Sequence, residues 1–334
     1  MSGPADAVAA VMLGSLVLYA LFGGADFGGG VWDLFAFGPR ASQQRALIEQ
    51  AIAPIWEANH VWLILVVVLL FTAFPAAYSA ATTALHVPLT LMLLGIVARG
   101  SAFVFRQYSP PSATLRRRWG RVFAISSTVT PLFLGIVIGA ITAGTVRFSD
   151  GLPVGGFVRP WLAPFPIAVG LVALALFAFL AAVYLTSEPG DVEVTEDFRR
   201  RALIAGLAVG LAAVASVITL GNAGAHFRAA LFGSWWSWPL QLATALAATS
   251  AFAALWLRRY RLARVCAIAQ VSLIVAGWGL AQRPYLIAPD VTLANAAAPA
   301  ATLRLLLIVL GIGIVILFPC LAWLYRVFKS SRSG

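Results

Sequence analysis

The chain has 334 residues, of which 61% are hydrophobic and 10% are charged, and its mean hydropathy is +0.92. This composition excludes a soluble globular domain and indicates a polytopic helical protein of the lipid bilayer. The net charge of +11 does not indicate nucleic-acid binding, because the basic residues form short clusters between apolar runs.

The apolar runs predict an all-α transmembrane bundle of nine helices, which makes residues 1–334 a single integral-membrane domain. The first run has no basic residues before it and continues into a glycine-rich polar segment, so we expect a retained helix and not a cleaved signal peptide. The acidic segment 187–201 is expected to be a solvated loop with the first turn of the next helix. The predicted spans are 8–36, 52–74, 77–106, 120–145, 162–186, 201–221, 239–258, 262–282 and 302–326.

The distribution of Lys and Arg predicts the orientation of these helices. With the N-terminus outside, the inner loops and the C-terminal segment hold 17 of the 23 basic residues, with clusters at 116–121, 199–201 and 258–264. The outer loops hold five. We therefore expect the C-terminus in the cytoplasm.

Ionisable residues are rare inside the predicted spans. The first helix holds Asp26 and Asp33, the second holds Glu57 and His60, and the third holds Arg99. Asp26 and Asp33 are seven residues apart and therefore share one face of the first helix, with glycines beside them that allow a neighbouring backbone to approach closely.

The predicted topology places Asp26, Glu57, His60 and Arg99 in one layer of the cytoplasmic half, with Arg99 about 10 Å from the inner end of its helix. Buried charges need partners, so Arg99 is expected to pair with Asp26 or with Glu57 and to leave the other carboxylate able to take up and release a proton. The layer is then either a structural ion pair that fixes helix packing or a proton-conducting entry from the cytoplasm.

The sequence offers few ligands for a haem or a metal ion. Its three histidines, His60, His86 and His226, fall on different predicted segments and at different depths. Cys266 and Cys320 both lie in apolar runs, as small buried hydrophobic residues do. We expect no metal site, no haem ligation and no disulfide in this chain.

Two motifs near the N-terminus resemble those of subunit II of the cytochrome bd-type quinol oxidases. The segment GGADFGGGVWDLF fits a G-x-D-x-G-x-G pattern, and IAPIWEANHVWLI fits a P-x-W-[DE]-x-N-x-V-W-L pattern. The order and spacing of the motifs, the nine-helix layout and the late segment AQRPYLIAPDVTLANAAAP agree with that family. The matching residues are Gly24, Asp26, Gly28 and Gly30 in the first motif, and Pro54, Trp56, Glu57, Asn59, Val61, Trp62 and Leu63 in the second.

The resemblance implies a multi-pass subunit of a heterodimer in the bacterial cytoplasmic membrane that oxidises quinol and reduces dioxygen to water. It implies that subunit I, the partner, carries the b- and d-type haems, and that this chain stabilises the partner. A bound quinone and a small accessory subunit are further components that the family includes. The resemblance makes Asp26 and Glu57 candidates for a cytoplasmic proton path, joined by Arg99 and His60. The candidates for subunit packing are Gly24, Gly28, Gly30, Trp56, Asn59 and Trp62.

Two other functions suit parts of the pattern. A proton-coupled secondary transporter also uses intramembrane carboxylates, although the sequence has no convincing internal repeat. A stand-alone membrane cytochrome would need histidine pairs at matching depth, which the three scattered histidines do not offer.

Overall fold

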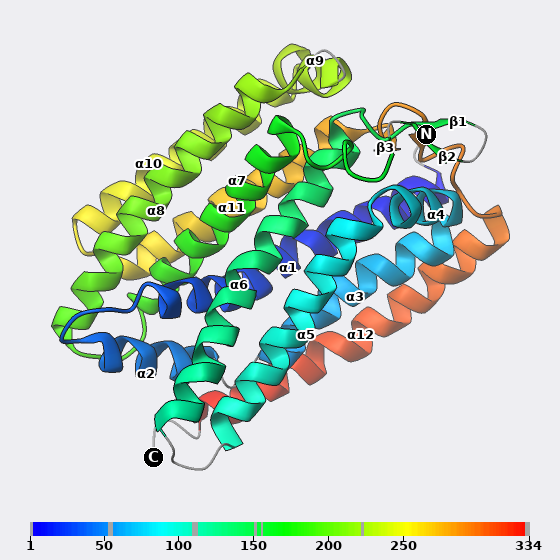
Figure 1. Ribbon diagram of the computed structural model, residues 1–334. Coiled ribbons are helices and arrows are strands. Elements are labelled where there is room, and N and C mark those ends of the chain that lie inside the picture. Colours follow the sequence, from blue (N-terminus) through cyan, green and yellow to red (C-terminus); the bar gives the residue numbers. More distant parts are fainter. Residues whose placement is uncertain are drawn as a thin grey trace.

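The computed structural model describes residues 3–52, 56–108, 113–149, 152–154, 156–221 and 224–330, and it is built almost entirely of helices (Figure 1). The helices are α1 (Pro4–Leu34), α2 (Ala41–Ile52), α3 (Trp56–Ala73), α4 (Pro75–Ala84), α5 (His86–Tyr108), α6 (Ala113–Thr142), α7 (Pro164–Leu185), α8 (Val192–Thr219), α9 (Ala225–Gly233), α10 (Ser237–Trp256), α11 (Tyr260–Gln282) and α12 (Ala300–Ser330). Two antiparallel hairpins complete the fold, β1 (Phe148–Ser149) with β2 (Leu152–Pro153) and β3 (Tyr285–Ile287) with β4 (Val291–Thr292).

The long helix α1 runs through the middle of the bundle. Pro4 occupies its first turn, where a missing N–H costs nothing, and the Asp6 carboxylate accepts a hydrogen bond from the Gly3 backbone N–H at 3.2 Å. The helix packs against α3, α6, α7, α11 and α12. Because it has neighbours on several sides, its inner half from Gly23 to Asp33 is almost wholly buried.

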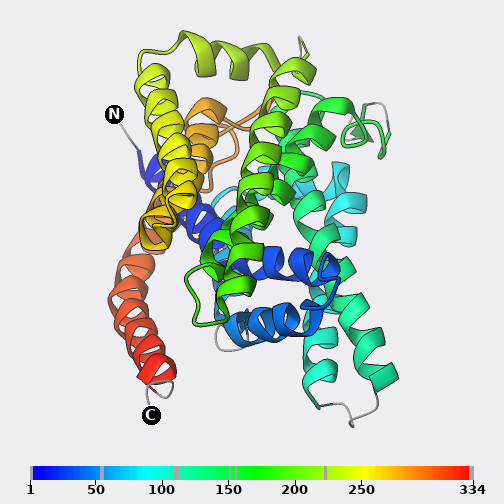
Figure 2. The same ribbon diagram turned by 90° about the vertical axis from the view of Figure 1, so that its left-hand side faces the viewer.

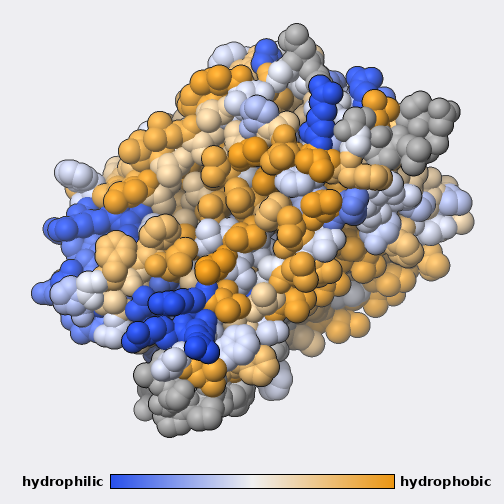
Figure 3. All heavy atoms as spheres, viewed as in Figure 1, coloured by the Kyte–Doolittle hydropathy of each residue, from blue (hydrophilic) through white to orange (hydrophobic). Residues whose placement is uncertain are grey.

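The two ends of the bundle differ in what they carry. The start of α1, α4, α9 and both hairpins gather at one end, whereas α2 and the last turns of α12 lie at the other (Figures 1 and 2). Apolar side chains cover much of the surface between the ends, and hydrophilic groups collect towards them (Figure 3). In the described residues, eight helices are long and apolar enough to cross a membrane. This distribution is that of a bundle embedded in a bilayer.

The expected second and third spans differ from the structure. The second corresponds to α3, which ends at Ala73 and is followed by α4 at a bend of 115°. The third, expected as one helix over 77–106, is broken at Leu85 into α4 and α5. Pro75 begins α4, where proline is favoured in the first helical turn, and hydropathy does not register such a change in direction. Eight spans, or nine with the bent pair, are therefore present in the described residues.

Three other segments expected to be loops are helical. The stretch after α1 forms α2, which buries Leu47 and Ile48 together with the polar Gln44, while Gln43 and Gln50 are exposed. A shorter helix, α9, lies between α8 and α10. The acidic segment belongs mainly to α8, which starts at Val192 because the Asp191 carboxylate accepts a hydrogen bond from the Glu193 N–H at 3.0 Å.

Candidate functional site

A fully buried ion pair joins α1 to α5 in the interior of the bundle. The Arg99 Nη2 donates to Asp26 Oδ1 at 2.5 Å, and the two residues are 0% and 4% exposed. The Arg99 guanidinium carbon also lies 4.7 Å from the Phe27 ring centre and 5.2 Å from that of Phe123. The two rings therefore add cation–π contacts to the carboxylate and hold the arginine in place.

The pair does not use all of its hydrogen-bonding capacity. Among the described residues, Asp26 Oδ2 and the Arg99 Nε and Nη1 groups have no hydrogen-bond partner, although all are buried. The Asn59 side chain is 1% exposed and lies close enough to the Asp26 carboxyl to interact with it, but neither of its amide atoms makes a hydrogen bond of regular geometry to a described residue. The Ser127 hydroxyl on α6 is likewise buried and unpartnered. Buried polar groups are usually satisfied, so this concentration is characteristic of a site with exchangeable partners.

A second ionic cluster lies seven residues farther along both helices. Asp33 Oδ2 on α1 accepts from Arg106 Nη1 on α5 at 3.2 Å, and Arg45 Nε on α2 is 3.4 Å from Asp33 Oδ1. Arg106 Nη2 also contacts Glu49 Oε2 at 3.2 Å. Asp33 is buried, whereas Arg45 and Glu49 are partly exposed, so the cluster connects the interior to the α2 end of the molecule.

The other predicted site residues on α3 have different surroundings. The His60 ring packs against Tyr19, with a centre-to-centre distance of 6.2 Å, and edge-on against Phe27 at 5.8 Å. Trp62 is buried and lies 6.2 Å from the Phe318 ring of α12. The side chains of Trp56 and Glu57 lie outside the described residues, so the expected layer is visible for Asp26, His60 and Arg99 alone.

The motif glycines allow α1 to approach its neighbours within this chain. A Cβ at Gly28 would lie 1.9 Å from the Phe177 carbonyl oxygen of α7, and one at Gly24 would lie 2.8 Å from the Phe177 ring. A Cβ at Gly30 would lie 2.2 Å from Ser127 of α6. These three positions therefore need a residue without a side chain.

Sequence reasoning placed Asp33 on the right face but did not identify its partners. The seven-residue spacing of Asp26 and Asp33 recurs in Arg99 and Arg106, and this matched spacing was the available signal. Ser127 gave no signal, because nothing in a single sequence distinguishes it from the neighbouring Ser126. The importance of Arg45 and Glu49 depends on α2, which was expected to be a loop.

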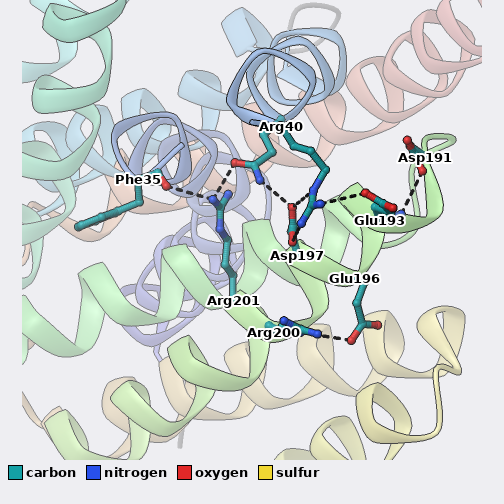
Figure 4. A network of polar contacts seen from close by, with 9 residues as sticks. Phe35, Arg40, Asp191, Glu193, Glu196, Asp197, Arg200 and Arg201 are labelled. Carbon is teal, nitrogen blue, oxygen red and sulfur yellow. Dashed lines mark hydrogen bonds and ion pairs between the residues drawn. The ribbon is translucent and has the colours of Figure 1, made fainter. Parts of the chain in front are cut away.

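A polar network fastens α2 to α8 at the same end of the bundle (Figure 4). Arg40 contacts Asp197 Oδ1 at 2.8 Å and Glu193 Oε2 at 2.9 Å. Gln44 donates to Asp197 and accepts from Arg201 Nη2 at 2.7 Å. An open cleft of about 720 Å³ beside the network is lined by residues that include Arg40, Asp197 and Arg258.

The residues present do not fit a haem or metal site in the described part of the chain. No group of three His, Cys, Asp or Glu side chains is arranged there to hold a metal ion. His86 Nδ1 lies 3.1 Å from the Thr83 carbonyl oxygen, and His226 Nε2 lies 2.7 Å from that of Arg283. The three histidines thus belong to three separate environments, none of which provides a second axial ligand.

Comparisons with known proteins agree with this arrangement. A provisionally named cytochrome bd menaquinol oxidase subunit II of Bacillus subtilis strain 168 is 26% identical, over 98% of this chain and 96% of that protein. Cytochrome bd-I ubiquinol oxidase subunit 2 of Escherichia coli K12 is 31% identical, over 51% of this chain and 45% of that protein. The structure of bd oxidase from Geobacillus thermodenitrificans shares the fold, with a TM-score of 0.82, 20% sequence identity, and coverage of 97% of this chain and 98% of that one. The family model for cytochrome bd terminal oxidase subunit II matches residues 5–328, nearly the whole sequence, and we conclude that the chain belongs to this family.

Proposed function

We propose that this chain is the non-haem-ligating subunit II of a bd-type terminal quinol oxidase in a bacterial cytoplasmic membrane. In the respiratory chain, the complex oxidises quinol and reduces dioxygen to water at haems in the partner, subunit I. Subunit II stabilises that partner and lines a proton path from the cytoplasm. The observation that carries the proposal is the buried, incompletely satisfied Asp26–Arg99 pair in a chain of this family.

The free bonding positions around the pair favour a proton-conducting role over a purely structural one. A buried ion pair that serves packing alone is expected to have its remaining donors and acceptors satisfied, because unsatisfied groups are costly in a low-dielectric interior. Here Asp26 Oδ2 and two Arg99 nitrogen groups have no protein partner among the described residues. Waters would accept hydrogen bonds from the Arg99 N–H groups, and only Asp26 Oδ2 would accept the transferred proton.

Each residue has a distinct part in the proposed path. Asp26 takes up and releases a proton at Oδ2 while Oδ1 stays bonded to Arg99. Arg99 positions the carboxylate and offsets its charge, and Asn59 lies beside it as a neutral polar neighbour. Glu57, the carboxylate of the second motif, is proposed as a further proton-carrying group, and His60 as a nearby polar side chain at the edge of the layer. Reduction of dioxygen to water consumes protons, which gives a path of this kind its purpose.

Family membership favours this function over a proton-coupled transporter. A transporter would also use buried carboxylates. The family match over residues 5–328, however, is to an oxidase subunit. The proposal therefore depends on assembly with a haem-bearing partner.

Co-purification tests the assembly. We expect mild-detergent affinity purification of this chain to yield a second membrane subunit and a reduced-minus-oxidised spectrum with b- and d-type haem bands. A colourless single chain from an intact preparation, with substrate uptake in liposomes, would contradict the proposal.

Mutagenesis tests the proton path. We expect Asp26→Ala and Glu57→Ala each to lower quinol-dependent oxygen consumption of the assembled complex by a factor on the order of 10² or more, as for the loss of a positioned proton-transfer group. Haem spectra of the variants serve as the control for assembly. Full activity of both variants, with intact spectra, would remove the proton-path claim while leaving the subunit assignment in place.

A further inference from the structure

We propose that the cytoplasmic entry to Asp26 runs along α1 through the Asp33 carboxylate and the Ser127 hydroxyl, linked by bound waters. This inference rests on the proposed proton path and adds to it a specific entrance and an intermediate group. It assigns Ser127 and Asp33 as proton-transferring residues.

The geometry of α1 supplies the line of the route. Asp26, Gly30 and Asp33 stand at i, i+4 and i+7, on one face of the helix. At 1.5 Å per residue, the two carboxylates are about 10 Å apart along the helix axis. Neither can pass a proton directly to the other over that distance.

The Ser127 hydroxyl lies between them. A Cβ built on Gly30 would be 2.2 Å from Ser127 Oγ, so the hydroxyl rests on the backbone of α1 at Gly30. Gly30 is about 6 Å along the axis from Asp26 and about 4.5 Å from Asp33, at the helical rise. One water with two hydrogen bonds spans roughly 5–6 Å between the heavy atoms that it joins. These axial separations are comparable to the span of one water, so the proposed route places one water on each side of Ser127.

Two of the three side chains along this line have a buried polar atom without a partner. Ser127 Oγ and Asp26 Oδ2 make no hydrogen bond to any described residue, whereas Asp33 Oδ1 has an ion-pair contact with Arg45 Nε at 3.4 Å and no hydrogen bond. Ser126, the adjacent residue, is also buried, but its hydroxyl donates to the Val122 carbonyl oxygen of its own helix at 2.6 Å. Ser127 is thus available to a proton route, whereas Ser126 is already bonded within α6.

The outer end of the line reaches the surface through α2 and α5. Asp33 contacts Arg106, whose other terminal nitrogen contacts Glu49 at 3.2 Å. The Glu49 side chain is 32% exposed, and that of Arg45, on the other side of Asp33, is 42% exposed. The arginines hold Asp33 in position and the exposed Glu49 collects protons at the entrance.

Proton transfer along the line needs no net chemical change. The Asp33 carboxyl releases a proton to the first water, which passes one to Ser127 Oγ as that hydroxyl donates its own to the second water. The second water then protonates Asp26 Oδ2, and each intermediate group returns to its starting state after it rotates.

Charged and titratable groups from several helices face the route. Near Asp33 they are Arg106 on α5 and Arg45 and Glu49 on α2. Near Asp26 they are Arg99 on α5, Tyr19 on α1 and His60 on α3. The faces of α6 and α7 packed on this part of α1 contribute Ser127, Phe123 and Phe177.

A pair of serine variants in the assembled oxidase tests the inference. We expect Ser127→Ala to lower the maximal rate of quinol-dependent oxygen consumption by on the order of tenfold, less than a full proton-transfer contribution because a water can partly replace the hydroxyl. The KM for quinol should not change, and the solvent deuterium isotope effect should rise. Ser126→Ala, with its hydroxyl bonded inside α6, should retain the parental rate and isotope effect. Equal behaviour of the two variants would overturn the role of Ser127.

Substitutions at Asp33 test the entrance. We expect Asp33→Asn to lower the maximal rate and to make it increase as the pH falls, because proton supply becomes rate-limiting. Asp33→Glu, which keeps a carboxylate near Arg106, should restore most of the rate and the original pH profile. A loss that is the same at every pH and is not rescued by Glu would show a structural role and overturn the inference.

The outcomes for Asp26 separate this inference from the proposed function. If Asp26→Asn impairs turnover while Asp33→Asn and Ser127→Ala do not, protons enter by another route and the inference alone fails. If Asp26→Asn also turns over normally with intact haem spectra, the proposed proton path fails with it.

Discussion

At the scale of single residues, the Asp26–Arg99 pair combines a large desolvation cost with a specific hydrogen-bonding geometry. Transfer of two charges from water to the interior is costly, and their attraction offsets that cost only when the geometry is good and the remaining groups find partners. The pair has a short contact and two flanking aromatic rings, yet several of its atoms have no protein partner among the described residues. It is therefore expected to be sensitive to the loss of either member.

Stability measurements on two variants separate packing from proton transfer. Asp26→Asn leaves Arg99 charged and uncompensated, so we expect a loss of about 3–5 kcal/mol in unfolding free energy. The double variant Asp26→Leu/Arg99→Met removes both charges and should be closer to the parent in stability while remaining inactive in oxygen consumption. Thermal unfolding in detergent and oxygen uptake of the assembled complex measure the two effects. Recovery of activity in the double variant would contradict the proton-transferring role of Asp26.

At the scale of elements, the closeness of α1 to α7 depends on glycine. The Gly28 Cα faces the Phe177 carbonyl group, and the position that a Cβ would occupy there is already filled by backbone. Backbone atoms cannot rotate away as the end of a side chain can, so the two helices would have to separate.

Two glycine substitutions on the same helix give a matched comparison. We expect Gly28→Ala to destabilise the protein by about 3 kcal/mol or more, at the upper end of overpacking costs. Gly14→Ala, which has nothing within 4 Å of its added Cβ, should be neutral or stabilising by up to about 1 kcal/mol through helix propensity. Thermal unfolding and yield of folded protein in detergent measure both. Similar stability of the two variants would show that α1 and α7 are not in close contact.

The attachment of α2 to α8 is also an element-scale property. The carboxylates of Asp197 and Glu193 raise the pKa of the Arg40 guanidinium above its already high ordinary value. Arg40 therefore stays charged over the whole physiological range, and its contribution to this attachment does not change with pH there. The hydrogen bond from Arg40 lowers the pKa of Asp197, so acid weakens this contact only once it protonates that carboxylate. Salt weakens the contact by screening.

Hydrogen exchange tests this attachment. We expect Asp197→Asn to weaken the contacts to Arg40 and Gln44 by about 1 kcal/mol, as for a partly exposed pair, and to increase amide exchange across α2. Glu196→Gln is the matched control, since Glu196 pairs chiefly with Arg199 in its own helix at 2.6 Å. If both variants exchange like the parent, the network does not hold α2 in place.

At the scale of the whole molecule, the distribution of Lys and Arg predicts the orientation in the membrane, and the apolar composition accounts for the character of the surface. The end that carries α2 and the last turns of α12 is the end that the charge asymmetry predicts to face the cytoplasm. Among the candidate spans in the described residues, α12 is the least buried by the rest of the chain: only 6% of its most apolar stretch is buried. Its exposed side chains include Ile308, Ile312 and Val315. Such a surface faces lipid or another membrane subunit.

Single-cysteine labelling checks the orientation. After replacement of Cys266 and Cys320 by Ala, we expect Val192→Cys to react with a membrane-impermeant maleimide only when the membrane is opened, and Val158→Cys to react in intact cells. These positions are 82% and 50% exposed, so both are accessible once the reagent reaches their side. Val192 begins α8 at the α2 end, next to the Glu193 that pairs with Arg40, whereas Val158 lies in the segment between β2 and α7, at the end that carries the hairpins. The reverse pattern would invert the proposed topology and move the Asp33 entrance to the outer surface.

The sequence by itself determined the features that depend on local composition and on short motifs. Runs of apolar residues predicted helices at the positions of the spans, because backbone groups in lipid must be bonded within the segment. The two N-terminal motifs indicated the family, which the comparisons confirmed. Tertiary structure decided what depends on direction and distance: the bend at Pro75, the break at Leu85, and the choice of Asp26 as the partner of Arg99. It also decided the environment of Ser127, because whether a hydroxyl is bonded within its own helix or rests on the backbone of another depends on how two distant segments pack.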